Sequence, residues 1–506
     1  MNRPALGWAE WARHDAVSLA ALVRTRQISA EEAVVQAVAA ARLLDPQLAA
    51  VLETFDDLLA KPQADGADPG GPLWGVPMFV KDLGSGIAGR LSEQGSALTM
   101  NRRCTRTDPL IANLHEAGLI VAGRAATAEL GMAYDTTTTY RGLRVTRNPW
   151  NLAHTPGGSS GGSAALVAAG VVPLAHATDG AGSTRIPAGL TGLIGLKVSR
   201  GRLPLPWHFN EYGNATFGEG VVTRTVRDAA AFLDAGSRHF PAGKGFVAAR
   251  HDAASFAAAL AKPPARLRIA ISSGKWGHDD DCHPLIAART REVAIVLERL
   301  GHTVEEIRDE EITDWHAFWP AFRIFWAGVR PATWGLAHGG ALPPEIEAAL
   351  SPMTRAFWLQ AQRHDKHDML RHQAVNNLHA LRMAQLFERC DVLLTPVLPI
   401  TAPLANGALS LAQETDFDAY VNALLSAGRY AIPANDAGLP VVSVPAGKDD
   451  GGLPVGVQLC GSWLAEGQLL QLAAQLEAAV PEWFGAVPRV HVSRLQHLPQ
   501  AMTFSA

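Results

Sequence analysis

The chain has 506 residues, 48% of them apolar, which is enough to bury a large hydrophobic core. Lys and Arg (44) nearly balance Asp and Glu (48), so the formal charge is only −4, which argues against nucleic acid or an acidic membrane surface as a partner. The opening residues lack the apolar run of a signal peptide, no stretch of 18 apolar residues occurs, and the four cysteines form no C-x-x-C motif. We therefore expect a cytoplasmic protein with no membrane span and no disulfide framework.

Two amphipathic helices are predicted at the start of the chain. Between Asp15 and about Leu48, apolar residues recur at helical spacing. Ser29 precedes Glu32 by three residues, which is the capping-box pattern that begins a helix. We assign residues 15–70 to this N-terminal helical region.

Strand-like and helical segments alternate through the rest of the chain. The apolar run 74–80 predicts a short buried strand that ends at Lys81. Further elements are predicted at 109–117 (helix), 118–122 (strand), 267–271 (strand), 284–300 (helix), 310–375 (helical, aromatic and charged), and 385–480 (three strands before a final helix at 466–480). The alternation predicts an α/β fold with a mostly buried sheet. No linker or repeat divides the chain, so we expect a single domain spanning residues 1–506.

Two glycine-rich motifs match well-known patterns but lack the structural context that those patterns need. Residues 84–89 fit G-x-G-x-x-G, yet a dinucleotide site needs a helix directly afterwards and an acid about 20 residues on at a strand end, whereas Asp108 stands before Pro109 at a predicted helix start. Residues 157–161 fit the G-x-S-x-G nucleophile elbow, but the preceding segment contains two prolines and turn formers instead of a strand.

A third interpretation combines Lys81 with Ser159 and Ser183. A serine needs a base to attack an amide carbonyl, and the poor leaving group then needs a proton. A neutral Lys81 could deprotonate Ser159, which deprotonates Ser183, and the relay in reverse would protonate the departing nitrogen. Keeping a lysine neutral at pH 7 costs roughly 4 to 5 kcal/mol, which the apolar run before Lys81 could supply through burial.

Small residues just before Ser183 suit an oxyanion hole. The backbone N–H groups of Gly180, Ala181 and Gly182 can point into one concavity, where each donor is typically worth about 3 to 4 kcal/mol in the transition state. Asp179 and Arg185 flank this loop, and we expect them to hold its shape through an ion pair.

These residues together resemble the amidase signature family. The segment 157–197, the 24-residue separation of Ser159 from Ser183, the GVPMFVKDL stretch and the PANDAGLP stretch all resemble that family's motifs. The resemblance implies one mixed sheet covered by helices, a catalytic core at 71–200, and neither metal nor organic cofactor. It also implies Lys81 as base, Ser159 as the bridging serine after a cis peptide bond, Ser183 as the acylated nucleophile, and Ser160 as structural support.

Within the family, TDGAGSTRIPA and RVTRNPWNL most resemble the nylon-oligomer hydrolase branch. That likeness implies a small-molecule amide substrate that is apolar, aryl, cyclic or oligomeric, with esters or carbamates as further options. Two alternatives remain open. One is the glutaminase subunit of a tRNA-dependent amidotransferase, although Arg429 stands near the position where that subunit has an acid. The other is a catalytically inactive binding or assembly subunit. Many relatives are dimers, so a homodimer is possible.

Substrate preference is expected to reside in variable aromatic stretches. The candidate pocket residues are Trp207, Tyr212, Phe318, Phe322 and Trp326. The alternative is that these rings are simply core. A further cluster, His364, His367 and His372, is interleaved with charged residues and is interpreted as a solvated helix face instead of a metal site.

Overall fold

An 11-stranded mixed β-sheet runs through the computed structural model, which describes residues 5–209, 216–240 and 255–495. The strand order is β1-β3-β2-β6-β8-β7-β12-β13-β11-β9-β10. The strands are β1 (Val51–Thr54), β2 (Pro77–Lys81), β3 (Ile120–Ala125), β6 (Leu174–Asp179), β7 (Ile194–Lys197), β8 (Gly218–Thr223), β9 (Arg268–Ile271), β10 (Thr303–Glu306), β11 (Val392–Pro396), β12 (Val441–Lys448) and β13 (Pro454–Gly461). A separate two-stranded sheet pairs β4 (Thr137–Thr138) with β5 (Arg144–Val145).

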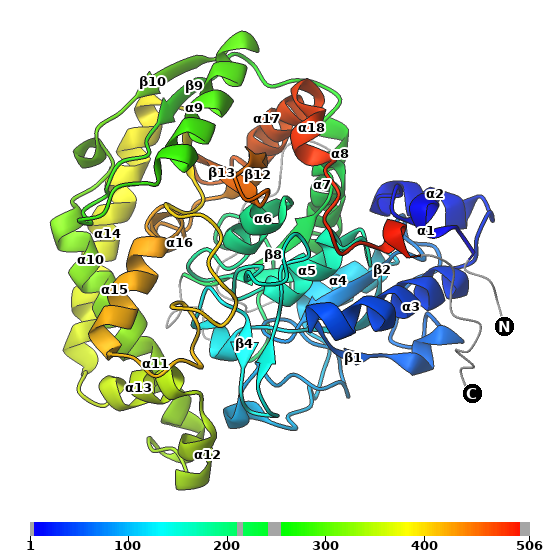
Figure 1. Cartoon of the computed structure of the whole chain (residues 1–506), viewed down its shortest axis with the longest axis horizontal. Coiled ribbons are helices and arrows are strands. Elements are labelled where there is room, and N and C mark those ends of the chain that lie inside the picture. The colour runs from blue at the N-terminus through cyan, green and yellow to red at the C-terminus, as the bar shows by residue number, and fades with distance from the viewer. Residues whose placement is uncertain (1–4, 210–215, 241–254, 496–506) are drawn as a thin grey trace.

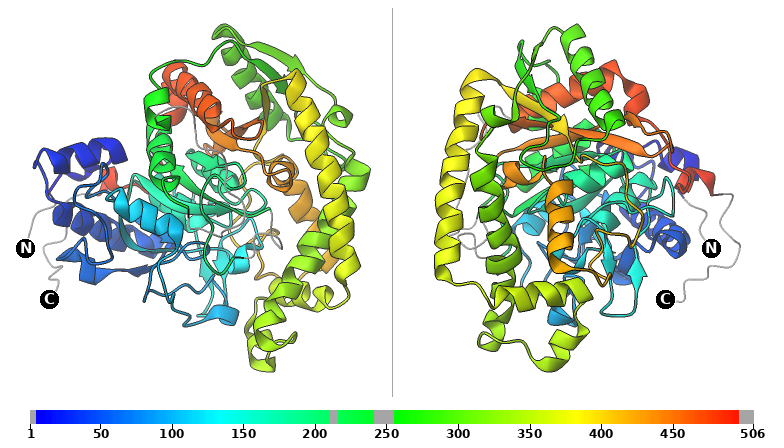
Figure 2. Two further views of the ribbon diagram at one scale, coloured as in Figure 1. Left: turned by 180° about the vertical axis from the view of Figure 1, so that it is seen from behind. Right: turned by 60° about the vertical axis from the view of Figure 1, so that its left-hand side comes forward.

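Helices surround this sheet (Figures 1 and 2). They are α1 (Trp8–Trp11), α2 (Ala16–Arg24), α3 (Ala30–Leu48), α4 (Pro109–Glu116), α5 (Gly161–Ala168), α6 (Arg185–Thr191), α7 (Val226–Gly236), α8 (Phe256–Ala259), α9 (Pro284–Arg299), α10 (Trp315–Ile324), α11 (Arg330–Ala332), α12 (Pro344–Ala349), α13 (Pro352–Ala361), α14 (Lys366–Arg389), α15 (Phe417–Ala427), α16 (Ile432–Asp436), α17 (Glu466–Ala479) and α18 (Pro481–Phe484). A π-helical turn, η5 (Phe325–Val329), joins α10 to α11. This architecture confirms the predicted α/β fold with one large mixed sheet covered by helices.

The sheet is mixed: parallel pairs lie towards both ends, the edge strand β1 is antiparallel to β3, and the middle of the sheet is antiparallel. β2 runs parallel to β3 and to β6, and β9 runs parallel to β10 and β11. From β6 across to β13 each neighbouring pair is antiparallel. The carboxyl ends of β2 and β6 therefore lie at the same edge, which brings Lys81 beside the end of β6.

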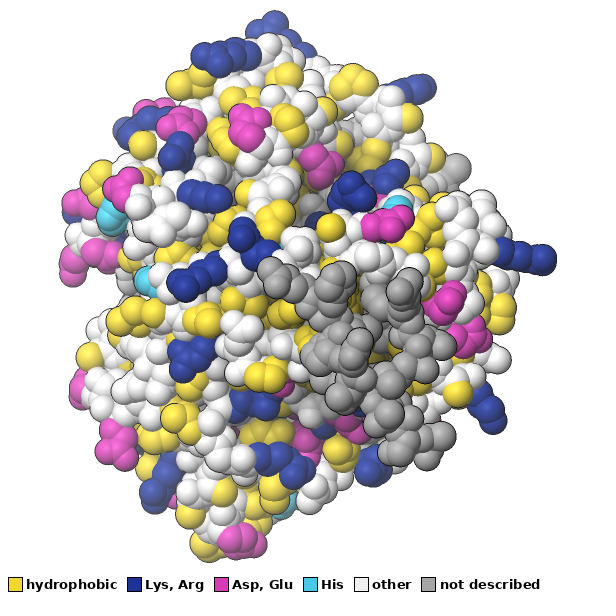
Figure 3. Space-filling view, turned by 45° about the vertical axis from the view of Figure 1, so that its right-hand side comes forward, with side chains coloured by type: hydrophobic (Ala, Val, Ile, Leu, Met, Phe, Trp, Pro, Cys, Tyr) yellow, Lys and Arg dark blue, Asp and Glu magenta, His cyan; other side chains and the backbone are white. Residues whose placement is uncertain are grey.

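Two groups of helices lie at opposite ends of the molecule. The N-terminal helices α2 and α3 lie at one end, whereas α10, α13, α14 and α15 form a layer at the other (Figures 1 and 2). One hydrophobic cluster joins the N-terminal helices to the sheet, and a second joins the aromatic residues of α10 and η5 to α14 and α15. On the face drawn in Figure 3, basic and acidic side chains are interspersed among apolar ones, in keeping with the balanced composition.

Most predicted elements are confirmed. The Ser29 capping box begins α3, and the predicted strands and helices correspond to β2, α4, β3, β9, α9, β11, β12, β13 and α17. The helical prediction for 310–375 is confirmed by α10 to α13 and the start of α14. None of the described helices is both long and apolar enough to cross a membrane.

Neither rejected glycine motif has the context it would need. After residues 84–89 the chain continues without helix or strand to residue 96, and the Asp108 carboxylate accepts a hydrogen bond from the Gly86 amide at 2.8 Å. Asp108 thus closes a loop at the start of α4 and does not end a strand. Residues 146–160 contain no strand, so Ser159 is not on a strand-to-helix elbow.

Close backbone approach explains the density of glycine around α5. A Cβ on Gly162 would lie 2.5 Å from the backbone nitrogen and oxygen of Ala126, at the end of β3. A Cβ on Gly158 would lie 2.6 Å from the Ala133 carbonyl oxygen. The segment 157–162 therefore packs directly against the backbone of 126–135, and larger residues cannot occupy these positions without displacing it.

We predict that Gly162→Ala destabilises the protein by about 1 to 3 kcal/mol, because the added methyl group overlaps backbone atoms that cannot move aside. Helix propensity alone would give the opposite sign, a gain of about 1 kcal/mol. Thermal unfolding followed by circular dichroism distinguishes the two. Gly7→Ala is the control, since a Cβ there meets nothing within 4 Å. A Tm equal to or above wild type for Gly162→Ala would contradict this packing.

Candidate active site

Lys81 is buried at the end of β2, and its side chain points to the hydroxyl groups of Ser159 and Thr178. Its Nζ lies 2.7 Å from Ser159 Oγ and 2.8 Å from Thr178 Oγ1, and the residue is only 2% exposed. Thr178 is in β6, the parallel neighbour of β2, so the sheet itself sets the distance between lysine and threonine. The sequence prediction named Lys81 and Ser159 but missed Thr178.

Burial lowers the pKa of Lys81 to about 7. The negative charges of Asp179 and Glu219 act in the opposite direction, and the positive charge of Arg330 adds to the lowering. At neutral pH a substantial fraction of Lys81 is therefore an uncharged amine, and an uncharged amine can accept a proton.

Ser159 and Ser183 each stand just before a short helix. Ser159 precedes α5 and follows a cis peptide bond from Gly158, as the family resemblance implied. Ser183 stands two residues before α6. Ser160 supports both neighbours, because its N–H donates to the Ser183 carbonyl at 3.2 Å and its Oγ donates to the Thr178 carbonyl at 3.2 Å.

The Ser183 hydroxyl makes no hydrogen bond with any side chain or backbone group of the described residues. The residue is 4% exposed, against 1% for Ser159. The Lys81 to Ser159 contact of the predicted relay is thus present in this structure, whereas a Ser159 to Ser183 hydrogen bond is not.

The loop before Ser183 differs in one respect from the predicted oxyanion hole. The Gly182 N–H donates to the Asp179 carboxylate at 2.6 Å, so it holds the loop and is not a free donor. The amides of Gly180, Ala181 and Ser183 have no acceptor within the described parts of the chain. Gly182 has φ +111° and a Cβ there would lie 2.7 Å from the Ala431 side chain, which explains why glycine occupies this position.

The predicted ion pair between Asp179 and Arg185 is confirmed and lies in a wider buried network. Arg185 Nε lies 2.9 Å from Asp179 Oδ2, and both side chains are fully buried. Burial alone would raise the pKa of Asp179, but the Arg185 guanidinium, Lys197 and the Asn435 amide hold it well below its usual range. Arg185 also donates to Gln458 and to Asn435, which ties the loop to β13 and α16.

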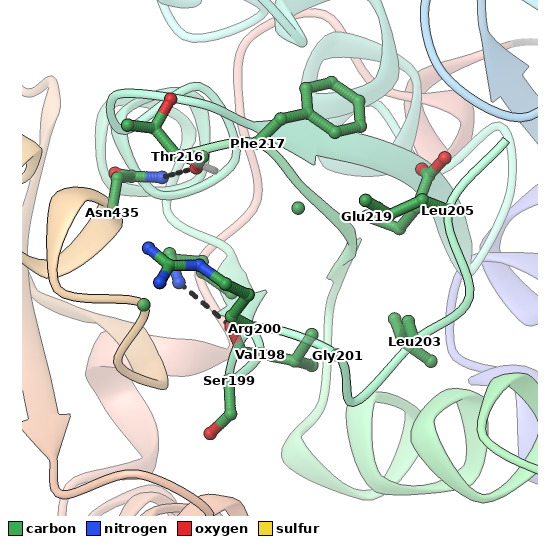
Figure 4. A pocket seen from close by; sticks show the side chains of 13 residues that line it. Val198, Ser199, Arg200, Gly201, Leu203, Leu205, Thr216, Phe217, Glu219 and Asn435 are labelled. Carbon is green, nitrogen blue, oxygen red and sulfur yellow. Dashed lines mark hydrogen bonds between the residues drawn. The ribbon is translucent and has the colours of Figure 1, made fainter. Parts of the chain in front are cut away.

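A small cavity borders this network on the side of β7 and β8 (Figure 4). Asn435 donates to the Thr216 carbonyl at its wall, with Arg200 beside it (Figure 4). The cavity measures about 20 Å³, room for about one water molecule.

The wall of this cavity also includes Lys197, whose pKa burial lowers to about 7. Lys197 Nζ donates to the carbonyls of Val198 and Leu439, at 2.9 and 2.7 Å, and it contacts no hydroxyl group. Two lysines of the described residues thus have a lowered pKa, and of these two Lys81 is the one that contacts a serine.

The backbone of Lys81 is held by a histidine and a glutamate. The Lys81 N–H donates to His176 Nδ1 at 3.2 Å, so the proton of this imidazole is on Nε2, which lies 2.5 Å from Glu219. Glu219 also accepts from Ser85 at 2.8 Å. These groups lie on β6, β8 and the loop after β2, and they fix the strand end from which Lys81 projects.

Three of the predicted pocket residues stack on one another, since the Phe322 ring centre lies 5.9 Å from that of Phe318 and 5.9 Å from that of Trp326. Phe318 and Phe322 are each 1% exposed and pack in the α10 core, where Phe318 lies 4.5 Å from the ring of His379 in α14. Trp207 instead packs on the loop before α4, with its Nε1 donating to the Thr107 carbonyl. Tyr212 lies outside the described residues. Trp326 joins this aromatic stack to the Lys81 site, because the Arg330 guanidinium carbon lies 4.2 Å above its ring. The assignment of these residues to a substrate pocket stays a prediction.

The interpretation of the three histidines needs a correction. His372 is 7% exposed and stacks on Phe325 at 4.3 Å, so it is not on a solvated face, whereas His367 is exposed and His364 pairs with Asp368. Within the described ranges, no group of three or more His, Cys, Asp or Glu side chains is arranged to hold a metal ion.

Known structures with the same fold define the class of protein. A structure of 6-aminohexanoate cyclic dimer hydrolase with its substrate superposes with a TM-score of 0.85 at 29% identity, over 95% of this chain and 99% of the other. A bacterial aryl acylamidase of the amidase signature family superposes with a TM-score of 0.81 at 26% identity, over 93% and 97%. The protein is a hydrolase that acts on carbon–nitrogen bonds.

Sequence comparison then gives the family. The family model described as Amidase matches residues 32–470. The 6-aminohexanoate-cyclic-dimer hydrolase of Pseudomonas sp. (strain NK87) is 32% identical over 495 residues, covering 94% of this chain and 96% of that protein. The chain belongs to the amidase family.

We predict that Arg185→Met destabilises the protein by about 3 to 5 kcal/mol, because it leaves the buried Asp179 carboxylate without its cation. Arg308→Met removes an exposed pair with Glu311 and should cost less than about 1 kcal/mol. Urea unfolding monitored by tryptophan fluorescence measures both. Similar midpoints for the two variants would show that Asp179 does not depend on Arg185.

Proposed function

We propose that the protein hydrolyses carboxylic amides through a relay of Lys81, Ser159 and Ser183. The observation that carries this proposal is the 2.7 Å contact between Ser159 Oγ and a buried lysine whose pKa is lowered to about 7. A lysine at pKa 7 divides its population between base and acid at neutral pH, which suits a group that must first accept a proton and then return it.

The proposed reaction begins when neutral Lys81 accepts the Ser159 proton while Ser159 accepts the proton of Ser183. Ser183 Oγ then attacks the carbonyl carbon of the amide, and the negative oxygen forms hydrogen bonds with the amides of Gly180, Ala181 and Ser183. The proton on Lys81 returns through Ser159 to the departing nitrogen, so the carbon–nitrogen bond breaks and Ser183 is left acylated. Water, activated by the same relay, releases the carboxylic acid and restores the hydroxyl.

For the substrate, we propose a small apolar, aryl, cyclic or oligomeric amide. The support is the identity of the relatives, one of which acts on a cyclic dimer of 6-aminohexanoate and another of which is an aryl acylamidase. Esters and carbamates could follow the same acyl-enzyme path. A homodimer and a cytoplasmic location remain predictions.

Two alternatives receive less support. The glutaminase hypothesis would need an acidic residue near the position of Arg429. The Arg429 guanidinium instead lies 2.8 Å from the Asp280 carboxylate. The inactive-subunit reading has no support from the contacts of Lys81, which retain the geometry of a working base.

We predict that kcat/KM rises with pH through an apparent pKa near 7. Protonation of Lys81 below this value removes the base, so activity is lost as the pH falls. A pH series on an anilide substrate measures this, with Lys197→Met as the control for the second buried lysine. Lys81→Met should lose about 100- to 10,000-fold of the rate at pH 8. A profile that is flat from pH 5.5 to 8.5 would exclude Lys81 as the titrating base.

We predict a single covalent adduct when the protein reacts with a fluorophosphonate, and its absence from Ser183→Ala. Intact-protein mass spectrometry detects it. Ser163→Ala is the control, because Ser163 lies in α5, close in sequence to Ser159, but its Oγ donates to the His176 carbonyl at 2.7 Å. Labelling that persists in Ser183→Ala and disappears from another serine variant would move the nucleophile elsewhere.

A further inference from the structure

Arg330, the first residue of α11, has a guanidinium group with an unsatisfied hydrogen-bond donor. Arg330 Nη2 donates to the Leu130 carbonyl at 3.1 Å, but Nη1 is buried and has no partner in the described chain. One turn earlier, the buried Nε1 of Trp326 also lacks a partner there. The Arg330 guanidinium carbon lies 4.2 Å from the centre of the Trp326 ring, so the two unpaired donors are neighbours.

No carboxylate balances this cation. None of the ion pairs between described residues includes Arg330, and burial lowers its pKa to about 10, with only Tyr134 acting against that shift. Arg330 is only partly buried as a residue, but its Nη1 is enclosed, and enclosed N–H groups in folded proteins nearly always have partners. No group of residues 5–209, 216–240 or 255–495 satisfies these two donors, which are therefore available to a bound molecule.

The unpaired donors of Arg330 and Trp326 lie beside the proposed relay. The Leu130–Gly131 turn lies between Arg330 and Ser159, because a Cβ on Gly131 would be 3.4 Å from Ser159 Oγ and 3.6 Å from Arg330 Nη2. The same turn is fixed to Ser159 by the Ala128 amide, which donates to the Ser159 carbonyl at 3.1 Å. Arg330 is also close enough for its charge to act on Lys81.

We propose that Arg330 and Trp326 form a subsite for a carboxylate in the amine half of the substrate. The inference rests on the proposed function, in which Ser159 returns the proton to the departing nitrogen, so the amine half lies on the Ser159 side of Ser183. A guanidinium presents paired N–H donors that match the two oxygens of a carboxylate, and the indole N–H adds a third donor. The substrate class is an N-acyl amino carboxylate, in which an acyl group is joined to an amine that also carries a carboxylate.

Binding to Ser183→Ala tests this without turnover. The ligands are N-benzoyl derivatives of glycine, β-alanine, 4-aminobutyrate and 6-aminohexanoate, each compared with its methylamide by isothermal titration calorimetry. We expect at least one carboxylate to bind about 10- to 100-fold more tightly than its methylamide. Adding Arg330→Gln should abolish that preference, whereas adding Arg323→Gln should retain it, because Arg323 pairs with Asp418 and Asn422 away from the relay.

A second variant protects the test against misfolding. Trp326→Phe keeps the ring under the guanidinium but removes the N–H, and we expect it to reduce the preference by about threefold to tenfold. The inference is overturned if no carboxylate in the series binds more tightly than its methylamide, or if the preference survives Arg330→Gln. Failure of the proposed function is seen separately, as fluorophosphonate labelling that does not depend on Ser183.

Discussion

The proposed active site depends on the burial of one lysine, Lys81, against one serine, Ser159. Lowering the pKa of Lys81 from 10.5 to about 7 corresponds to a cost on the order of 5 kcal/mol for removing the ammonium from water. The protein meets this cost by placing the side chain at the joined ends of two parallel strands, β2 and β6, where the apolar face of the sheet excludes solvent. Thr178 and Ser159 then give Nζ two hydroxyl partners and no carboxylate in direct contact.

The surrounding network keeps charges at the right distance from that lysine. Asp179 follows Thr178 directly, and an unpaired carboxylate there would favour the ammonium form of Lys81. Arg185 engages Asp179 through Nε and Nη2, while Asn435 donates to the same carboxylate. This pairing also shapes the loop that carries Ser183, so one ion pair acts on both the proposed base and the proposed oxyanion donors. Lys197 shows the contrast: it has a similarly lowered pKa but donates to two backbone carbonyls and has no nucleophile to act on.

Local patterns predicted the parts of this structure that local physics decides. The capping box at Ser29, the buried strand before Lys81 and the glycine-rich block followed from spacing and residue size, and the family resemblance supplied the cis bond before Ser159 and the contact of Lys81 with Ser159. Contacts between segments that are distant in the sequence could not be predicted in this way. Arg330 is nearly 150 residues from Ser183, and no pattern around it indicates that its guanidinium reaches the Leu130 carbonyl.

The same limit explains the incorrect expectations. Gly182 has the right size for an oxyanion donor, but its N–H donates a hydrogen bond to the nearby Asp179 carboxylate instead. His372 follows a charged stretch and nevertheless stacks on Phe325 once α14 packs against η5. Each outcome depends on a partner far away in sequence or on competition between acceptors.

The most direct test of this account is the pKa of Lys81 itself. Carbon-13 labelling of lysine side chains, with NMR titration from pH 5 to 11 and assignment through Lys81→Met and Lys197→Met, would measure it in the intact protein. The account predicts that the Lys81 signal titrates near pH 7, as burial requires. A signal that stays in the ammonium form up to pH 10 would contradict it, because Lys81 would then be unable to act as the base of the relay.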